Sequence, residues 1–302
     1  FSMSIFEKVK ELRDITGAGM QDCKIALSEN SEDIDLAIEY LRKKGIAKAA
    51  KKSDRGASEG LVTIFNSGTK SSIVEINSET DFVAKNPEFN AFCEKISSLS
   101  ASSKNMDELK EKKFNENETV SSALISLVAK IGENIQIRRF ENIDLGCDVV
   151  SYIHNKQTDH SGKLGVLLAY ESKHENAKVF ANQICMHIAA SSPLSLDETG
   201  ISQSFLENEK NIMKDQLLNE GKKIEMIDKI ISGKVSKIIK DNTLLGQKWV
   251  MNPELAVNTA IKNFEDENKA SFVIKQFVRY KVGEGIENKK SDFAEEVKNL
   301  TK

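Results

Sequence analysis

An internal repeat constrains the fold of this chain more than any other feature of its sequence. Gly60–Phe65 is matched 88 residues later, and the next β-branched run, Ile73–Asn77, is matched 93 residues later. The helical pattern at Phe92–Ile96 returns to a shift of 88. The second copy is therefore five residues longer between its first two segments and five residues shorter before its helix. We expect such a chain to fold as a duplicated unit.

Both copies predict the same elements, because short β-branched runs predict strands and apolar residues at helical spacing predict helices. Each copy has two strands, two helices and a third strand, which is predicted at Ile135–Phe140 and at Phe272–Val282. The third strands carry Arg138 and Arg279, which we expect at matching points of the two copies. Antiparallel strands with helices against one face predict an α+β fold with a duplicated antiparallel-sheet-plus-helices core.

The second copy contains an insertion, because Arg138 and Arg279 stand much farther apart in the sequence than the two first helices do. It lies at about residues 204–247, where apolar residues recur at spacings of 3, 4 and 7 on either side of a turn at Gly221. Two helices joined by a short glycine turn predict an antiparallel helical hairpin. Phe293, Val297 and Leu300 predict one more helix at the end of the chain.

Three short helical patterns occupy residues 5–41, and Thr16–Gly19 separates the first two. A bundle of this size resembles a ubiquitin-associated-type module. The stretch from Arg42 to Arg55 holds seven basic residues and one acid, Asp54, which is typical of a solvated linker. The predicted parts are a three-helix domain with its basic linker (3–55), the first core repeat (56–141), the second core repeat with the inserted hairpin (142–286) and a C-terminal helical module (287–302).

The composition gives no case for cofactor chemistry. A net charge of −3 does not favour nucleic acid, which usually needs a basic domain or face. The four cysteines include no C-x-x-C pair, which argues against a zinc site and a disulfide framework. The phosphate-binding glycine loop and the Cys/His and Ser/His/Asp arrangements are missing too, so we expect no catalytic residue, metal or cofactor. His187 lies on an apolar helical segment and is expected to be partly buried and hydrogen-bonded.

The sequence shows no targeting or membrane signal. Its apolar runs fall short of a membrane span, and no signal peptide precedes the first helix, which favours a cytoplasmic protein. Phe1 and Ser2 are expected to be a remnant of expression, with Met3 as the native start.

The stretch Thr80–Asn86 joins a predicted strand to a predicted helix and places Phe82 beside a carboxylate. Two interpretations of Phe82 are open. It folds back under the loop as a satellite of the core, or it stays exposed for another molecule to receive, since an exposed Phe forgoes roughly 1.5–3 kcal/mol of burial. The extra residues of the first copy fall on this stretch. A packing role common to both copies would not need them, which favours the exposed interpretation.

Four blocks of the sequence resemble the elongation factor Ts family, and together they span nearly the whole chain. They are Leu12–Lys24, Asn77–Lys85, Lys130–Arg139 and Val282–Glu287. The resemblance implies a guanine-nucleotide exchange factor for elongation factor Tu, acting in translation elongation in the bacterial cytoplasm without making or breaking bonds. The implied partner is elongation factor Tu, GDP-bound or nucleotide-free, with no membrane and no direct nucleic acid. Complexes of one-to-one and two-to-two stoichiometry both stay open.

The resemblance also implies how the loop acts. Thr80, Asp81, Phe82 and Val83 are expected to enter the partner and to disturb the Mg²⁺ and phosphate environment of bound GDP. The alternative is a non-catalytic scaffold for another protein or RNA, which would require the Asp81–Phe82 loop to be merely structural. A steep salt dependence would reveal RNA binding.

Further partner contacts are implied outside the loop. Leu12, Gly17, Gly19 and Met20 are expected where the N-terminal module docks on the nucleotide-binding domain of elongation factor Tu. His154 is expected at a contact with a later domain of the partner. The turn after His154 is longer and more polar than the resemblance leads us to expect.

Overall fold

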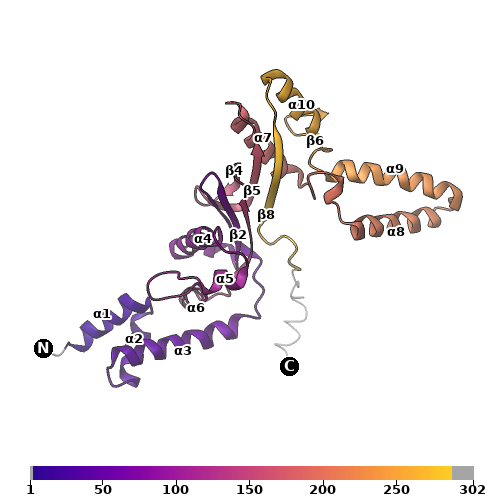
Figure 1. Ribbon diagram of the computed structural model, residues 1–302. Helices are drawn as coiled ribbons and strands as arrows, with labels where there is room; N and C mark the ends of the chain where they lie inside the picture. The colour runs from indigo at the N-terminus through magenta and orange to yellow at the C-terminus, as the bar shows by residue number, and fades with distance from the viewer. Residues whose placement is uncertain (1–2, 288–302) are drawn as a thin grey trace.

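The computed structural model describes residues 3–287, which form ten α-helices and eight β-strands (Figure 1). The helix predicted around Phe293, Val297 and Leu300 lies outside the described residues. The rest of the predicted α+β architecture is confirmed: three N-terminal helices, two antiparallel repeats with helices, and an inserted helical hairpin. The division of the chain into four domains stays a prediction.

The N-terminal helices are α1 (Ile5–Thr16), α2 (Met20–Glu29) and α3 (Ile34–Lys52). Ser4 caps α1 in a reciprocal capping box with Glu7, which satisfies free amides at the start of the helix. The bundle closes on a small apolar core of its own. Its buried residues are Val9, Leu12, Cys23, Ala26, Leu27 and Ala37.

The basic stretch predicted as a linker at 42–55 is helical over most of its length, because α3 continues to Lys52. Alanine and lysine favour helix, and the second half of α3 finds a surface to pack on. A Cβ added at Gly45 would lie 3.8 Å from Ala129 and 4.0 Å from Ile125, and Ala49 packs against the core of the first repeat. A single helix therefore joins the N-terminal bundle to the core.

The first repeat contains three strands, three α-helices and a short 3₁₀ turn. They are β1 (Glu59–Asn66), β2 (Lys70–Ser78), the 3₁₀ turn η1 (Asp81–Lys85), α4 (Pro87–Ser100), α5 (Met106–Glu111), α6 (Val120–Ile131) and β3 (Gln136–Asp144). Helix α5 was not predicted, because its stretch is polar and buries only Leu109.

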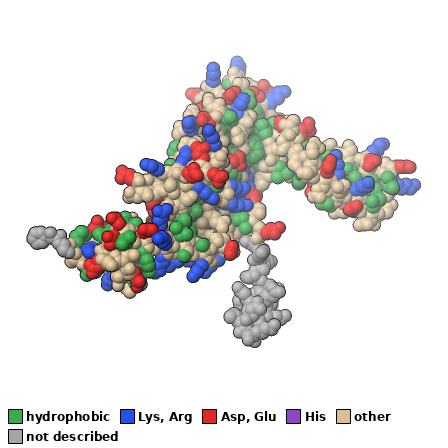
Figure 2. Space-filling view, turned by 60° about the horizontal axis from the view of Figure 1, so that its bottom comes forward, with side chains coloured by type: hydrophobic (Ala, Val, Ile, Leu, Met, Phe, Trp, Pro, Cys, Tyr) green, Lys and Arg blue, Asp and Glu red, His purple; other side chains and the backbone are tan. Residues whose placement is uncertain are grey.

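The second repeat follows the same order around its insertion. It consists of β4 (Asp148–Lys156), β5 (Ser161–Glu171), α7 (Ala177–Ser191), the 3₁₀ turn η2 (Glu198–Gly200), α8 (Gln203–Asn219), α9 (Ile224–Asn242), β6 (Lys248–Trp249), β7 (Asn252–Ala256), α10 (Val257–Asn268) and β8 (Val273–Lys281). Helices α8 and α9 form the predicted hairpin, which projects from the core on the side away from the N-terminal helices (Figures 1 and 2). Leu206, Met213, Leu217 and Ile227 are buried within it.

Six strands form one antiparallel sheet in the order β3-β2-β1-β5-β4, with β8 paired to β5, while β6 and β7 pair in a separate two-stranded sheet. The two halves of the six-stranded sheet join where β1 pairs with β5 at Val62–Gly162. One apolar cluster lies under the helices of each repeat, and a third contains residues from strands of both. The helices therefore cover the outer faces of the sheet, while the two repeats share an inner core.

Burial confirms the repeat in the first helix, where six buried positions recur at a shift of 88. They are Phe89, Phe92, Cys93, Ile96, Ser97 and Ser100 in α4, and Ala177, Phe180, Ala181, Ile184, Cys185 and Ile188 in α7.

The predicted match of Arg138 with Arg279 is wrong. Helices α6 and α10 are equally long and occupy equivalent places in the two repeats, but they lie closer together in the sequence than Arg138 and Arg279 do. The insertion in the second repeat is therefore shorter than the spacing of the two arginines implied. The register places Arg279 opposite Val166, and the equivalent of Val166 in the first repeat, Ile73, pairs with Glu141. Arg279 therefore corresponds to Glu141. The two arginines were matched because they are the same residue type, and the pairing of the strands does not support that match.

Candidate partner-binding site

The connection between β2 and α4 presents Phe82 to solvent. Its side chain is 75% exposed, and Asp81 beside it is exposed as well. The next two residues turn inward: Val83 is 6% exposed and Ala84 is 3% exposed, and both belong to the core of the first repeat. Phe82 is therefore not a satellite of the core. Val83 holds the loop to the scaffold, and its expected contact with the partner stays a prediction.

Glu133 holds the other side of this loop. One of its carboxylate oxygens accepts hydrogen bonds from the backbone N–H groups of Glu79 and Thr80, both at 3.0 Å. The other accepts a hydrogen bond from the Thr80 hydroxyl at 2.6 Å. In return, Glu79 Oε1 accepts a hydrogen bond from the backbone N–H of Asn134 at 2.6 Å. The two segments thus clasp each other through reciprocal bonds to charged groups, which are stronger than neutral ones.

The far end of the loop is fixed by two asparagines. Asn86 caps α4, and its Oδ1 accepts hydrogen bonds from the backbone of Glu88 and Phe89. Asn90 Nδ2 donates to the carbonyl oxygens of Ala84 and Asn86 at 2.9 and 2.8 Å. The exposed pair Asp81–Phe82 therefore projects from a loop that is bound to the scaffold on both sides.

A second exposed surface lies at the turn between α1 and α2. Gly17 adopts the left-handed conformation, with φ of 66°, that ends α1, and Met20 is 45% exposed at the start of α2. Gly19 precedes Met20 and is also exposed. Leu12, also expected at the partner contact, is fully buried in the free chain and packs the core beneath this surface.

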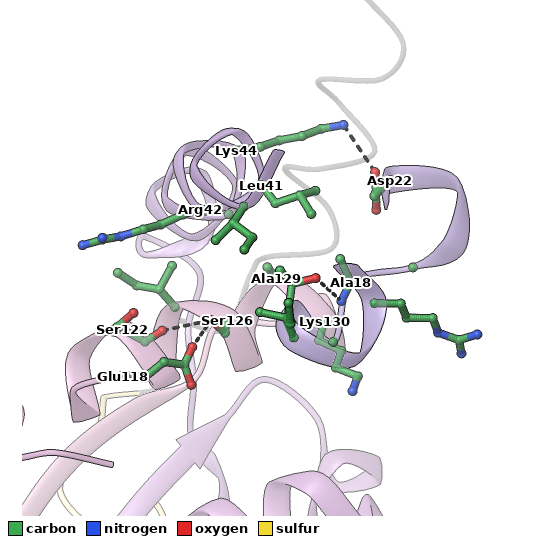
Figure 3. Close-up of a pocket in the computed structure, with 18 of the residues that line it drawn as sticks. Ala18, Asp22, Leu41, Arg42, Lys44, Glu118, Ser122, Ser126, Ala129 and Lys130 are labelled. Atoms are coloured by element: carbon green, nitrogen blue, oxygen red, sulfur yellow. Dashed lines mark hydrogen bonds and ion pairs between the residues drawn. The ribbon is translucent and has the colours of Figure 1, made fainter. Parts of the chain in front are cut away.

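A groove of about 1320 Å³ runs between this turn and the first core repeat. In Figure 3, α3 with Leu41 and Lys44 forms one side, and α6 with Ala129 and Lys130 forms the other. Lys44 Nζ donates to Asp22 Oδ1 at 3.3 Å at one end. The groove mixes apolar side chains with charged groups of both signs.

His154 lies on β4 in the regular register opposite Leu164, and its side chain is exposed. Its Nδ1 is 3.1 Å from the Tyr152 hydroxyl. The turn that follows is compact, because β4 continues to Lys156 and β5 begins at Ser161. The extra polar residues therefore lengthen the hairpin and leave His154 within a strand.

Comparison with known proteins identifies the family. The model of the family "Elongation factor TS" matches residues 79–284. The chain is 41% identical over 298 residues to elongation factor Ts of Rickettsia typhi, covering 97% of this chain and 96% of the relative. It is 44% identical over 302 residues to elongation factor Ts of Clostridium kluyveri, covering 97% of both.

The chain belongs to the elongation factor Ts family. The predicted resemblance is confirmed, and with it a role in translation elongation. The match begins at Glu79, at the base of the loop that presents Phe82, and includes His154.

Residues 3–287 contain no group of three or more His, Cys, Asp and Glu side chains placed to hold a metal ion. None of the helices in that range is long and apolar enough to cross a membrane. His187 is hydrogen-bonded as predicted, and it is fully rather than partly buried: its Nδ1 accepts a hydrogen bond from the backbone of Val250, and its Nε2 lies 3.0 Å from Gln247 Oε1. Burial lowers the pKa of His187, and the hydrogen bond to Gln247 opposes this effect.

Two features of the site were missed from the sequence. The first is Glu133, which stands directly after the helix-ending Gly132, a position that suggested only the end of a helix. The second is the apolar rim of the groove, where Phe6 is 68% exposed and Ile15 is 50% exposed. Phe6 falls outside the stripe of α1 that faces the bundle, and that offset was the available signal.

Proposed function

We propose that this protein is the guanine-nucleotide exchange factor of elongation factor Tu and that it drives GDP release with the Asp81–Phe82 tip. The observation that carries the proposal is the 75% exposure of Phe82 on a loop that is otherwise fixed by the core and by Glu133. An aromatic side chain held in solvent by an ordered loop is poised for burial in a partner. The names of the relatives support the choice of partner class.

The tip would act by loosening the phosphate end of GDP. Much of the affinity for a guanine nucleotide comes from Mg²⁺ that bridges its phosphates, so displacing the shell of this ion weakens binding without a covalent step. The Phe82 side chain would enter the partner as a wedge, and its burial contributes roughly 1.5–3 kcal/mol. Because each 1.36 kcal/mol is about a factor of ten in rate, the wedge alone supplies roughly one to two decades.

A larger acceleration needs a wider interface. Met20 and Gly19 on the α1–α2 turn, and His154 on β4, are exposed and available for further contacts. Every such contact stabilises the complex with nucleotide-free partner. Because coupling is reciprocal, the protein must weaken GDP binding by the same factor by which GDP weakens binding of the protein.

The test is release of a fluorescent GDP analogue from elongation factor Tu, with and without this protein. We expect Asp81→Asn to slow release most when Mg²⁺ is abundant and least when a chelator has already removed the metal. His160→Gln, a change at another exposed side chain, serves as the matched control. Absence of acceleration by the unaltered protein, or an Asp81 defect of equal size with and without chelator, would contradict the proposal.

A further inference from the structure

We propose that Glu133 is a positioning residue that holds the Asp81–Phe82 tip in its projecting conformation. That Glu133 orders the loop is inferred from the geometry of the free protein. The effect of this order on GDP release rests on the proposed exchange function. Three hydrogen bonds converge on the Glu133 carboxylate, and all of them come from Glu79 and Thr80 at the base of the tip. No other side chain of the described chain donates or accepts as many bonds with this segment.

Glu133 can act as a fixed point because its own backbone is held. Gly132 ends α6 in the left-handed conformation, with φ of 86°, and its carbonyl oxygen accepts a hydrogen bond from Lys52 Nζ at 2.6 Å. Asn134 is buried, and its Nδ2 donates to the carbonyl oxygen of Arg55 at 2.6 Å. The end of α3, the end of α6 and the base of the tip are thus joined in one hydrogen-bonded junction.

The second repeat has neither a residue equivalent to Glu133 with a side-chain acceptor nor the extended loop. Helix α10 is followed by Lys269, which adopts the left-handed conformation as Gly132 does after α6. The residue after it, Ala270, therefore stands where Glu133 stands in the first repeat. Ala270 has no side-chain acceptor, and the strand-to-helix connection of that repeat lacks the extension. The carboxylate and the extension occur together in one copy and are both missing from the other.

The physical role of the clasp is to keep the tip in one arrangement before it meets a partner. A loop that samples many conformations binds with an apparent affinity or rate reduced by the fraction of time it spends in the competent one. Order imposed in advance removes that loss, as it does in other preorganised sites. Val83 and Ala84 fix the loop after the tip, so only the segment before the tip depends on Glu133.

The test compares Glu133→Ala with Glu133→Gln, which retains one acceptor oxygen. Glu108→Ala is the matched control, because Glu108 also accepts a hydrogen bond from a loop backbone, Lys104 N–H at 3.2 Å, elsewhere in the same repeat. In the free protein we expect Glu133→Ala to speed hydrogen exchange of the Glu79 and Thr80 amides by about tenfold or more, with Glu133→Gln in between. Unchanged exchange at these amides would overturn the inference, whatever the partner does.

The consequence is measured by release of the fluorescent GDP analogue from elongation factor Tu at increasing concentrations of each variant. We expect Glu133→Ala to lower the maximal rate about tenfold and Glu133→Gln to retain part of that rate, while the melting temperature of Glu133→Ala stays close to that of Glu108→Ala. A loosened loop with an unchanged maximal rate would also overturn the inference. A Phe82→Ala variant that exchanges GDP normally would contradict the proposed function instead, so the two failures are distinguishable.

A double-mutant cycle separates positioning from direct contact. If Thr80 works through Glu133, then Thr80→Val combined with Glu133→Ala should be no slower in GDP release than Glu133→Ala alone. Additive defects would mean that Thr80 touches the partner independently and would contradict a clasp made by this pair.

Discussion

The two core repeats share a scaffold and differ most where a strand passes into the first helix. Residues 79–86 make this connection in the first repeat, and residues 172–176 make it in the second. The first repeat uses its extra length in two opposite ways, because Val83 and Ala84 enter the core while Phe82 leaves it. A duplicated unit can thus keep one copy for packing and adapt the other for presentation without altering the sheet.

The cores beneath the two connections also differ, because the second repeat has more aromatic residues at equivalent positions. In the second repeat, the Phe180 ring stacks on Phe264 at 4.6 Å between ring centroids and meets Phe272 and Trp249 edge-on. At the equivalent positions the first repeat has a single aromatic residue. The pairs are Phe92 with Phe180, Leu127 with Phe264, and Ile135 with Phe272. Phe82 on the first connection lies outside the core of its repeat.

The largest effect that tests this contrast is on stability. Phe180→Ala removes the centre of the aromatic cluster, so we expect it to lower the free energy of unfolding by roughly 3–5 kcal/mol. Denaturant unfolding followed by circular dichroism measures the change. A loss below about 1 kcal/mol would mean that the aromatic residues of the second repeat do not carry its packing, and the contrast between the repeats would fail.

The next effect is on exchange and comes from the other phenylalanine. We expect Phe82→Ala to change the free energy of unfolding by less than about 0.5 kcal/mol, because the side chain is largely exposed. The same variant should slow GDP release from elongation factor Tu by roughly one to two decades. Phe82→Ala should therefore slow exchange and leave the free energy of unfolding nearly unchanged, whereas the main effect of Phe180→Ala should be on the free energy of unfolding. A Phe82→Ala protein that unfolds much more easily yet exchanges normally would reverse our assignment.

Val83 tests whether the first connection really serves both purposes. Val83→Ala removes two methyl groups from a buried site, so we expect a loss of about 1–2 kcal/mol in unfolding free energy. It should also slow GDP release by less than Phe82→Ala does, because the tip keeps its own side chains. A larger exchange defect than that of Phe82→Ala would show that Val83 meets the partner directly.

The sequence allowed the scaffold to be predicted because its signals are periodic and occur twice. The buried positions of α4 and α7 recur at one spacing, so each copy supports the other. The continuation of α3 through Lys52 was missed, because charge composition indicates exposure but not conformation. The mismatch of Arg138 with Arg279 has a related origin. Strand register depends on pairing and bulges, and a shared residue type does not report either.

The exposed Asp81–Phe82 tip was predictable from the sequence, but the residue that supports it, Glu133, was not. The extension of one copy pointed to Phe82 because a length difference between repeats can be read directly from the chain. Glu133 lies far from Glu79 in the sequence, and only the folded chain brings their hydrogen bonds together. Leu12 and Val83 lie in the family-like blocks and are buried in the free chain, so these blocks include residues that hold a surface in place.

The smallest predicted effect is a pH dependence that belongs to the second repeat. Its buried His187 corresponds to Leu99 in the first repeat, and burial lowers its pKa in the folded protein. As the pH falls through about 6.5, His187 binds a proton in the unfolded chain but not in the folded one. The free energy of unfolding is therefore at its full value above that pH and declines below it, by at most about 1.4 kcal/mol per pH unit.

We expect His187→Leu to be less stable at pH 7, because Gln247 and Val250 lose their partner, but to show a smaller decline between pH 7 and 5. Denaturant midpoints at three pH values measure the slope, with His160→Gln as the exposed control. An unchanged slope in His187→Leu would place the pH dependence elsewhere and remove this difference between the repeats.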